Sequence, residues 1–165
     1  MKHKSRVYPF LDLDISYQFT KTIHCNTSEH VSMIVEKLDR IKEDNFGKIK
    51  IPKFDYKVSD HTVIQTVEYI KGRKCAMSVK KYRDRIYNEL VEKDREWTFC
   101  DFNYDNFIVL EKEDLIYAID FQSYSFIPNK NKRKELWRED LETNNLVLEY
   151  ITRELPFRKD AKLIQ

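Results

Sequence analysis

Two aspartates and an asparagine in residues 97–121, WTFCDFNYDNFIVLEKEDLIYAIDF, have the types and the spacing for chemistry on a phosphate group. Asp101 and Asn106 lie in a short polar connection, and Asp120 follows the next predicted strand pair. Because a hairpin returns its far end beside its near end, we expect Asp120 close to the Asp101 connection. Carboxylate and amide oxygens suit Mg²⁺, and phosphate oxygens can complete its shell. A carboxylate that does not bind the metal could orient or deprotonate a hydroxyl.

Hydrophobic periodicity predicts the elements in the first half of the chain. Ile15, Tyr17, Phe19 and Ile23 follow a period of two, which indicates a strand. Apolar residues then recur at three and four from about Ser28 to Asp44, so this range is predicted to be a helix capped by Thr27 or Ser28. Residues 48–72 predict two strands joined by a turn at Ser59-Asp60 and closed by Gly72.

The second half is predicted to alternate helices with one strand pair. Residues 76–97 place Met77, Tyr82, Ile86, Leu90 and Val91 near one helical face. Residues 106–121 indicate a hairpin with a charged turn at 111–114, and residues 134–155 a helix that Pro156 ends. The order of strands and helices predicts an α+β fold with two separate groups of strands.

Composition limits the classes of function. The 165 residues suit one domain or two small lobes, and a net charge of +2 with both signs interspersed gives no case for a nucleic-acid partner. The three cysteines, Cys25, Cys75 and Cys100, show no metal-ligand spacing, which favours a reducing compartment. No signal peptide or apolar run of about 20 residues occurs. We therefore expect a cytoplasmic protein with no membrane partner.

The motifs resemble those of the protein-kinase-like fold. D-F-N-Y-D-N, residues 101–106, is similar to the D-x-x-x-x-N catalytic loop, and Ile119-Asp120-Phe121 looks like the metal-binding D-F-G. I-D-F without glycine is closest to the aminoglycoside and choline phosphotransferase branch. VEYIKG, residues 67–72, resembles the hinge of the family. The resemblance covers roughly residues 15–127 and implies a minimal two-lobed fold, with an N-terminal lobe at 1–72 and a helical C-terminal lobe at 73–165.

The resemblance also implies roles for individual residues and two cofactors, ATP and Mg²⁺. Asp101 matches the catalytic aspartate, and Asn106 and Asp120 match the two metal ligands. Lys21 in FTKTI matches the strand lysine that holds the nucleotide phosphates, with Glu36 as its helix partner. Hinge residues Glu68, Tyr69 and Ile70 would offer backbone groups to the adenine. The acceptor would be a hydroxyl of a small molecule or a protein.

The sequence departs from the family in ways that keep other readings open. No glycine precedes Gly47, so no Gly-rich phosphate loop is visible. A pseudokinase that serves as a nucleotide- or protein-binding module is the alternative to an active phosphotransferase. A metal-dependent hydrolase would use the same carboxylates without a nucleotide. In a domain unrelated to kinases, Asp101 and Asn106 would be turn formers, Lys21 a solvated strand residue and Glu36 an outer-face charge.

Overall fold

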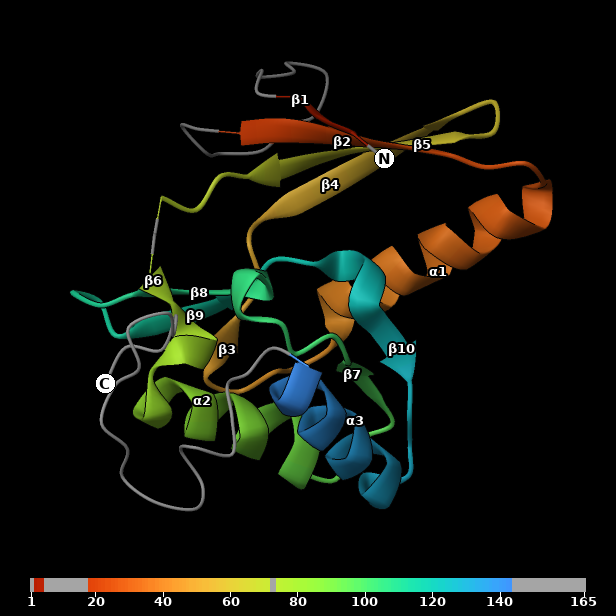
Figure 1. The fold of residues 1–165 in the computed structure, drawn as a ribbon. Coiled ribbons are helices and arrows are strands. Elements are labelled where there is room, and N and C mark those ends of the chain that lie inside the picture. The colour runs from red at the N-terminus through yellow and green to blue at the C-terminus, as the bar shows by residue number, and fades with distance from the viewer. Residues whose placement is uncertain (1, 5–17, 72–73, 144–165) are drawn as a thin grey trace. The chain divides into compact units, whose positions relative to one another are not determined.

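The computed structural model describes residues 2–4, 18–71 and 74–143, and these form an α+β structure (Figure 1). The α+β class predicted from the sequence is therefore confirmed. Contacts between Cα atoms divide the chain into two units, of which the first is Met1–Asp44 with Pro52–Ile70. The second unit is Asn45–Ile51 with Lys71–Gln165. The lobe boundary expected at residue 72 remains a prediction.

The first unit contains an antiparallel sheet with the strand order β1-β2-β5-β4. Its strands are β1 (Lys2–Lys4), β2 (Gln18–His24), β4 (Phe54–Ser59) and β5 (Thr62–Glu68). The predicted turn between β4 and β5 is confirmed, and Asp60 has a φ of 54° there, a conformation that aspartate tolerates better than most residues. The strand predicted from Ile15 begins at Gln18 among the described residues, so Ile15 and Tyr17 lie outside them, as does Gly72.

Helix α1 (Ser28–Glu43) is the helix of the first unit, and its boundaries follow from its caps. The hydroxyl of Thr27 accepts a hydrogen bond from the His30 N–H at 3.1 Å, which confirms the predicted N-cap. Leu38 and Ile41 on its apolar face are each 2% exposed, and the helix contacts β5. Burial of this face, rather than helix propensity, supplies most of the stability of such a helix.

The second unit contains two sheets. One has the order β3-β9-β8-β6, built from β3 (Ile49–Lys50), β6 (Lys74–Cys75), β8 (Phe107–Leu110) and β9 (Leu115–Ala118). The other pairs β7 (Trp97–Phe99) with β10 (Tyr124–Phe126). The predicted hairpin and its charged turn are confirmed as β8 and β9. Strand β3 pairs in parallel with β9, so residues 45–51 belong to this unit and not to the strand pair predicted over residues 48–72.

The helix predicted over residues 76–97 is divided into three short pieces. A 3₁₀ turn at Ala76–Ser78 precedes helix α2 (Lys80–Tyr87), and a π-helical turn at Asn88–Glu92 follows it. The five apolar residues assigned to its buried face are all at most 2% exposed. The prediction ended the helix too late, because Trp97 pairs with Phe126 as the first residue of β7.

Helix α3 (Lys130–Thr143) begins four residues earlier than predicted. Asn129 explains the difference, because its side chain accepts a hydrogen bond from the Lys132 N–H at 3.0 Å as an N-cap. Arg133, 1% exposed, donates from this helix to five carbonyl oxygens. These belong to Val91, Lys93, Arg95, Ile127 and Pro128, at 2.8–3.0 Å. The predicted continuation of the helix to residue 155 lies outside the described residues.

Among the described residues, no helix combines the length and the apolar character needed to cross a membrane.

Candidate functional site

The connection between β7 and β8 carries two of the predicted site residues, Asp101 and Asn106. It runs from Cys100 to Asn106, and its last three residues form the 3₁₀ turn Tyr104–Asn106. A second connection, from Ile119 to Ser123, joins β9 to β10 and carries Asp120. Antiparallel pairing of β8 with β9 and of β10 with β7 brings the two connections to the same end of the strands.

Backbone hydrogen bonds hold these two connections side by side. The Ile119 N–H donates to the Asn106 carbonyl at 3.0 Å, and the Cys100 N–H donates to the Ser123 carbonyl at 3.1 Å. These two bonds fix both ends of the Asp120 connection against the Asp101 connection. The sequence-based expectation that Asp120 lies close to Asp101 agrees with this geometry.

The amides of the first connection position Asp101. The Asn103 side-chain amide donates to a carboxylate oxygen of Asp101. The Asn106 amide donates to the Asp101 backbone carbonyl at 3.1 Å, which closes the connection on itself. The sequence analysis did not identify Asn103 as a site residue, although it lies inside the motif D-F-N-Y-D-N, two residues after Asp101.

Asp120 is the N-cap of the 3₁₀ turn Phe121–Ser123. One of its carboxylate oxygens accepts a hydrogen bond from the Gln122 N–H at 3.2 Å. The Ser123 hydroxyl donates to the Asp120 carbonyl at 3.1 Å. The turn therefore fixes the position of Asp120 after the end of β9.

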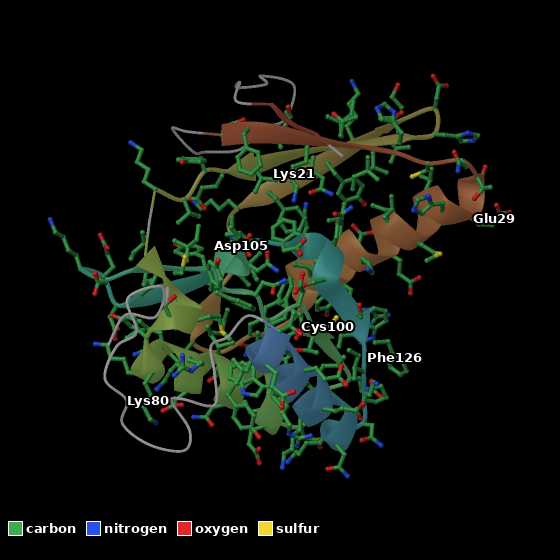
Figure 2. The ribbon with its side chains drawn as sticks, viewed as in Figure 1. Lys21, Glu29, Lys80, Cys100, Asp105 and Phe126 are labelled. Atoms are coloured by element: carbon green, nitrogen blue, oxygen red, sulfur yellow. The ribbon has the colours of Figure 1, made fainter. Side chains whose placement is uncertain are left out.

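Burial and like charges raise the pKa of Asp101. Desolvation is the largest cause, and the negative charges of Asp140, Asp120 and Asp105 act in the same direction. A hydrogen bond from the Asn106 side chain acts in the opposite direction. A carboxylate with a raised pKa is a better proton acceptor than an ordinary one, which is the property that a general base needs. Figure 2 labels Cys100 and Asp105, which belong to the same connection as Asp101.

Asp140 is a member of this site that sequence reasoning missed. It lies on α3, and its carboxylate accepts a hydrogen bond from the Phe102 N–H at 2.8 Å. Phe102 directly follows Asp101 and is completely buried, so this bond ties the connection to the helix. In the sequence Asp140 stands in the charged run REDLE, where nothing distinguishes it from a solvated helix residue.

The metal ligands that the resemblance implies are two oxygen-bearing side chains. Among the described residues, no three His, Cys, Asp or Glu side chains are grouped as metal ligands. The expected ligands, Asn106 and Asp120, supply one amide and one carboxylate. Such a pair binds Mg²⁺ only when phosphate oxygens and water complete the shell, as at nucleotide-dependent sites.

Lys21 lies on β2 in the first unit and is buried. It is 5% exposed, so the alternative of a solvated strand lysine is wrong (Figure 2). Glu36 does not contact it, because Glu36 pairs with Arg40 at 3.5 Å on the outer side of α1, with 65% of its side chain exposed. The structure therefore does not bring together the lysine and the glutamate that the resemblance pairs.

The residues expected to form a hinge, Glu68, Tyr69 and Ile70, are the last three residues of the first unit. The Glu68 N–H donates to the Lys53 carbonyl at 2.8 Å, and the Glu68 carboxylate accepts from the Lys53 N–H at 2.9 Å. The rings of Tyr69 and Phe19 pack edge to face, with their centroids 6.3 Å apart, and Ile70 is 7% exposed. Glu68 thus forms two hydrogen bonds with Lys53, the residue that precedes β4. That these three residues bind an adenine stays a prediction.

Two cysteines are close to the site. The Cys100 thiol donates to the Ser123 carbonyl at 3.0 Å, a contact that joins the two connections again. Burial and the charge of Asp105 raise the pKa of the Cys75 thiol. A raised pKa disfavours the thiolate, so Cys75 is poorly suited to act as a nucleophile.

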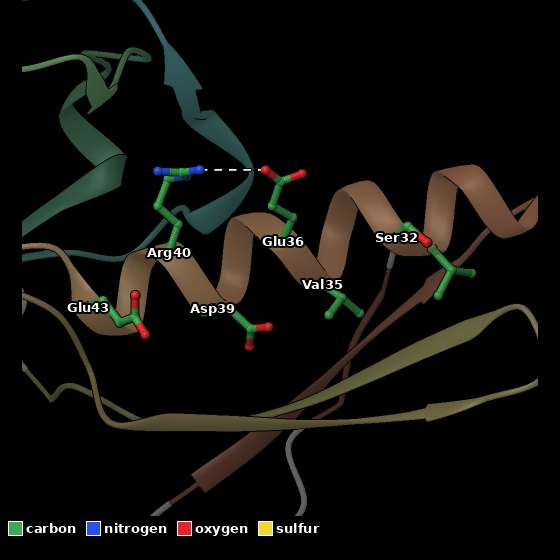
Figure 3. Close-up of a pocket in the computed structure, with 7 residues that line it drawn as sticks. Ser32, Val35, Glu36, Asp39, Arg40 and Glu43 are labelled. Atoms are coloured by element: carbon green, nitrogen blue, oxygen red, sulfur yellow. Dashed lines mark hydrogen bonds and ion pairs between the residues drawn. The ribbon is translucent and has the colours of Figure 1, made fainter.

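A shallow hollow lies beside α1 and is lined by that helix alone (Figure 3). Its side chains include the apolar Val31 and Val35 and the charged Glu36, Asp39 and Arg40. Figure 3 shows the Glu36–Arg40 ion pair on one side of the helix and Asp39 on another. None of the residues predicted for the phosphate or the metal, apart from Glu36, belongs to this hollow.

Comparison with known proteins gives no family for this chain. No protein-family model matches it, and no curated protein is significantly similar to it.

Proposed function

We propose that this protein is a kinase-like phosphotransferase that moves the γ-phosphate of ATP to a hydroxyl, with Mg²⁺ as its metal. The proposal rests on one observation above all, the hydrogen bonds that hold the Asp101 and Asp120 connections side by side. A D-x-x-x-x-N loop and an I-D-F segment could occur together by chance. Their convergence at one end of two strand pairs supports the proposal, because phosphoryl transfer depends on groups held together in position.

In this proposal each residue has a distinct task. Asp101, whose pKa is raised, positions the acceptor hydroxyl and takes up its proton. Asn106 and Asp120 hold the metal, and Lys21 holds the nucleotide phosphates. Most of the rate enhancement would come from positioning and charge neutralisation, which explains how so few residues could suffice.

The second candidate is a pseudokinase that keeps the nucleotide site as a binding module. The absence of any glycine before Gly47 favours it, because backbone N–H groups of a Gly-rich loop usually hold the transferred phosphate. Both candidates bind a nucleotide, and they differ in turnover.

Thermal unfolding with ATP and Mg²⁺ together, and with each alone, tests the proposal. At a ligand concentration 100 times Kd, binding adds about 2.7 kcal/mol of stability, which raises the unfolding temperature by several degrees. We expect this rise only with both ligands and expect Asp120→Asn to abolish it. Asp84→Asn is the matched control, because Asp84 is an exposed carboxylate of the same unit, paired with Lys80 on α2.

Four outcomes are informative. A rise that needs both ligands, with ATP consumed when hydroxyl compounds are added, supports the phosphotransferase. The same rise without turnover supports the binding module. No rise under any condition contradicts a nucleotide site, and a rise with Mg²⁺ alone favours the metal-dependent hydrolase.

A further inference from the structure

Strand β4 is the last strand in the sheet of the first unit. In the order β1-β2-β5-β4 it pairs with β5 alone among the described residues. The Glu68 N–H donates to the Lys53 carbonyl at 2.8 Å, so the backbone carbonyl of Lys53 points toward β5. Because these directions alternate along an antiparallel strand, the backbone groups of residues 54, 56 and 58 point away from β5. An outer edge of this kind is a template for pairing with another strand.

The sequence of β4 is complementary to itself in one antiparallel register. When Tyr56 of one copy faces Tyr56 of another, Asp55 faces Lys57, and Phe54 faces Val58. A register centred on residue 55 or on residue 57 places like charges opposite each other, and one centred on either end pairs fewer residues. Val58 is a large apolar side chain that is 42% exposed at this edge. The register centred on Tyr56 therefore matches charge with opposite charge and covers Val58.

Two side chains of helix α1 contact this edge. The Lys42 ammonium lies 5.3 Å from the centroid of the Phe54 ring and 5.7 Å from that of the Tyr56 ring. It donates to the Asp55 carboxylate at 3.0 Å. The Tyr56 hydroxyl donates to the Asp39 carboxylate at 2.6 Å, and Figure 3 shows Asp39 on a different side of α1 from the Glu36–Arg40 pair. The helix thus holds the middle of β4 through Asp39 and Lys42.

The Asp55 carboxylate occupies a backbone group that a further strand would need. Its Oδ1 atom accepts from the Tyr56 N–H at 2.8 Å and from Lys42. Burial acts to raise the pKa of Asp55, but the hydrogen bonds from Lys42 and the Tyr56 N–H, with the Lys42 charge, outweigh it and hold the pKa below its ordinary value. Asp55 is therefore charged at neutral pH, and both of its hydrogen bonds persist there.

We propose that β4 is a pairing edge for a second copy of this chain, and that the Lys42–Asp55 ion pair keeps this edge closed in the monomer. When Lys42 releases Asp55, the carboxylate is available to Lys57 of the second copy and the Tyr56 N–H to its backbone. Both side chains of the ion pair are 39% exposed, so it contributes little to stability. Charged side chains at a sheet edge are a common means of preventing unwanted pairing, which gives this ion pair a different role.

The Lys42→Met substitution in the full chain tests this inference. Methionine keeps the contact with the two rings and removes the ammonium. We expect self-association to become about tenfold tighter for each copy that loses the ion pair, and about a hundredfold tighter for the symmetric dimer. Sedimentation equilibrium over a range of protein concentrations measures the change. Hydrogen exchange at the Tyr56 and Val58 amides should slow as the dimer forms, because both face the second copy.

Three further variants locate the interface. Lys42→Arg keeps a cation and should stay monomeric like the wild type. Arg40→Met removes an exposed cation of the same helix, paired with Glu36, and should also leave the protein monomeric. Adding Lys57→Asp to Lys42→Met places two acids opposite each other in the proposed register and should restore the monomer.

Each outcome decides the matter. A dimer of Lys42→Met that Lys57→Asp abolishes supports the inference. A Lys42→Met protein that stays monomeric overturns it, and so does a dimer that is insensitive to Lys57→Asp, because that dimer uses another surface. A wild type that pairs through β4 as tightly as Lys42→Met overturns the closing role of the ion pair. Circular dichroism checks the fold, and Lys42→Gln replaces Lys42→Met if the methionine variant does not fold.

Discussion

The charge of Asp101 depends on its surroundings. Burial and three neighbouring carboxylates raise its pKa above the ordinary value of 3.8, so the folded protein binds a proton there more tightly than the unfolded chain. The stability that this proton provides is fully present below pH 3.8 and is lost as the pH rises through the raised pKa. At neutral pH the charged Asp101 is therefore a local destabilising feature, as is common for groups kept for function.

We accordingly predict that Asp101→Asn stabilises the protein at pH 7 and that the gain disappears on acidification. Asparagine keeps an oxygen that can accept from Asn103 and removes the charge that burial disfavours. Urea unfolding of the variant and the wild type between pH 3 and pH 8 measures this difference. Asp84→Asn should show no such gain, because the carboxylate of Asp84 is largely exposed and paired with Lys80. A gain that is equal at every pH would contradict the raised pKa.

At the residue scale, the sequence predicts those residues of the candidate site that belong to a recognisable motif. Asp101, Asn106 and Asp120 lie in the two short connections that the hydrogen bonds hold together. Asp140 could not be found in this way, because its partner Phe102 is distant in sequence. Its identification depends on a contact of helix α3, which only the folded chain provides.

At the scale of elements, helix α3 holds the Asp101 connection through one carboxylate. We predict that Asp140→Ala destabilises the protein by about 1–3 kcal/mol, because it leaves the Phe102 N–H without an acceptor beside a buried ring. Hydrogen exchange at the Phe102 amide should become about tenfold faster or more. Asp140→Asn, which retains an acceptor oxygen, should stay close to the wild type, and Glu139→Ala provides the control on the same helix. Equal exchange rates in Asp140→Ala and the wild type would contradict this contact.

Periodicity predicts the elements that are long enough to show it. Helix α1 and the β4–β5 and β8–β9 hairpins follow from apolar spacing and turn residues. Pairing of β7 with β10 could not be predicted, because each strand has three residues and the partners are separated by a whole hairpin. The π-helical turn at Asn88–Glu92 keeps the apolar face of the predicted helix while changing its hydrogen bonds, so the sequence pattern there does not reveal it.

At the scale of the whole molecule, residues 45–51 contribute to the core of the second unit. The Phe46 ring lies 5.0 Å from the Phe99 ring and 5.9 Å from the Tyr124 ring, and it is 4% exposed. We predict that Phe46→Ala destabilises this unit by about 3–5 kcal/mol. Both tryptophans, Trp97 and Trp137, belong to the second unit, so urea unfolding followed by tryptophan fluorescence reports on it.

The control for this prediction lies in the same segment. Lys48 is exposed, and Lys48→Ala should change the free energy of unfolding by less than about 0.5 kcal/mol. A fluorescence transition that is equally insensitive to Phe46→Ala would show that residues 45–51 do not contribute to the second core.

The parallel pairing of β3 with β9 has a consequence for the protein while it is being made. Strand β3 leaves the ribosome early, but its partner strand follows roughly 65 residues later, a delay of several seconds at ~5–20 residues per second. The strands of the first unit are complete by residue 68, whereas Phe46 and Ile49 must wait uncovered for theirs. Each newly synthesised molecule thus passes through an interval in which an apolar segment, with its partner strand not yet made, is open to chaperones.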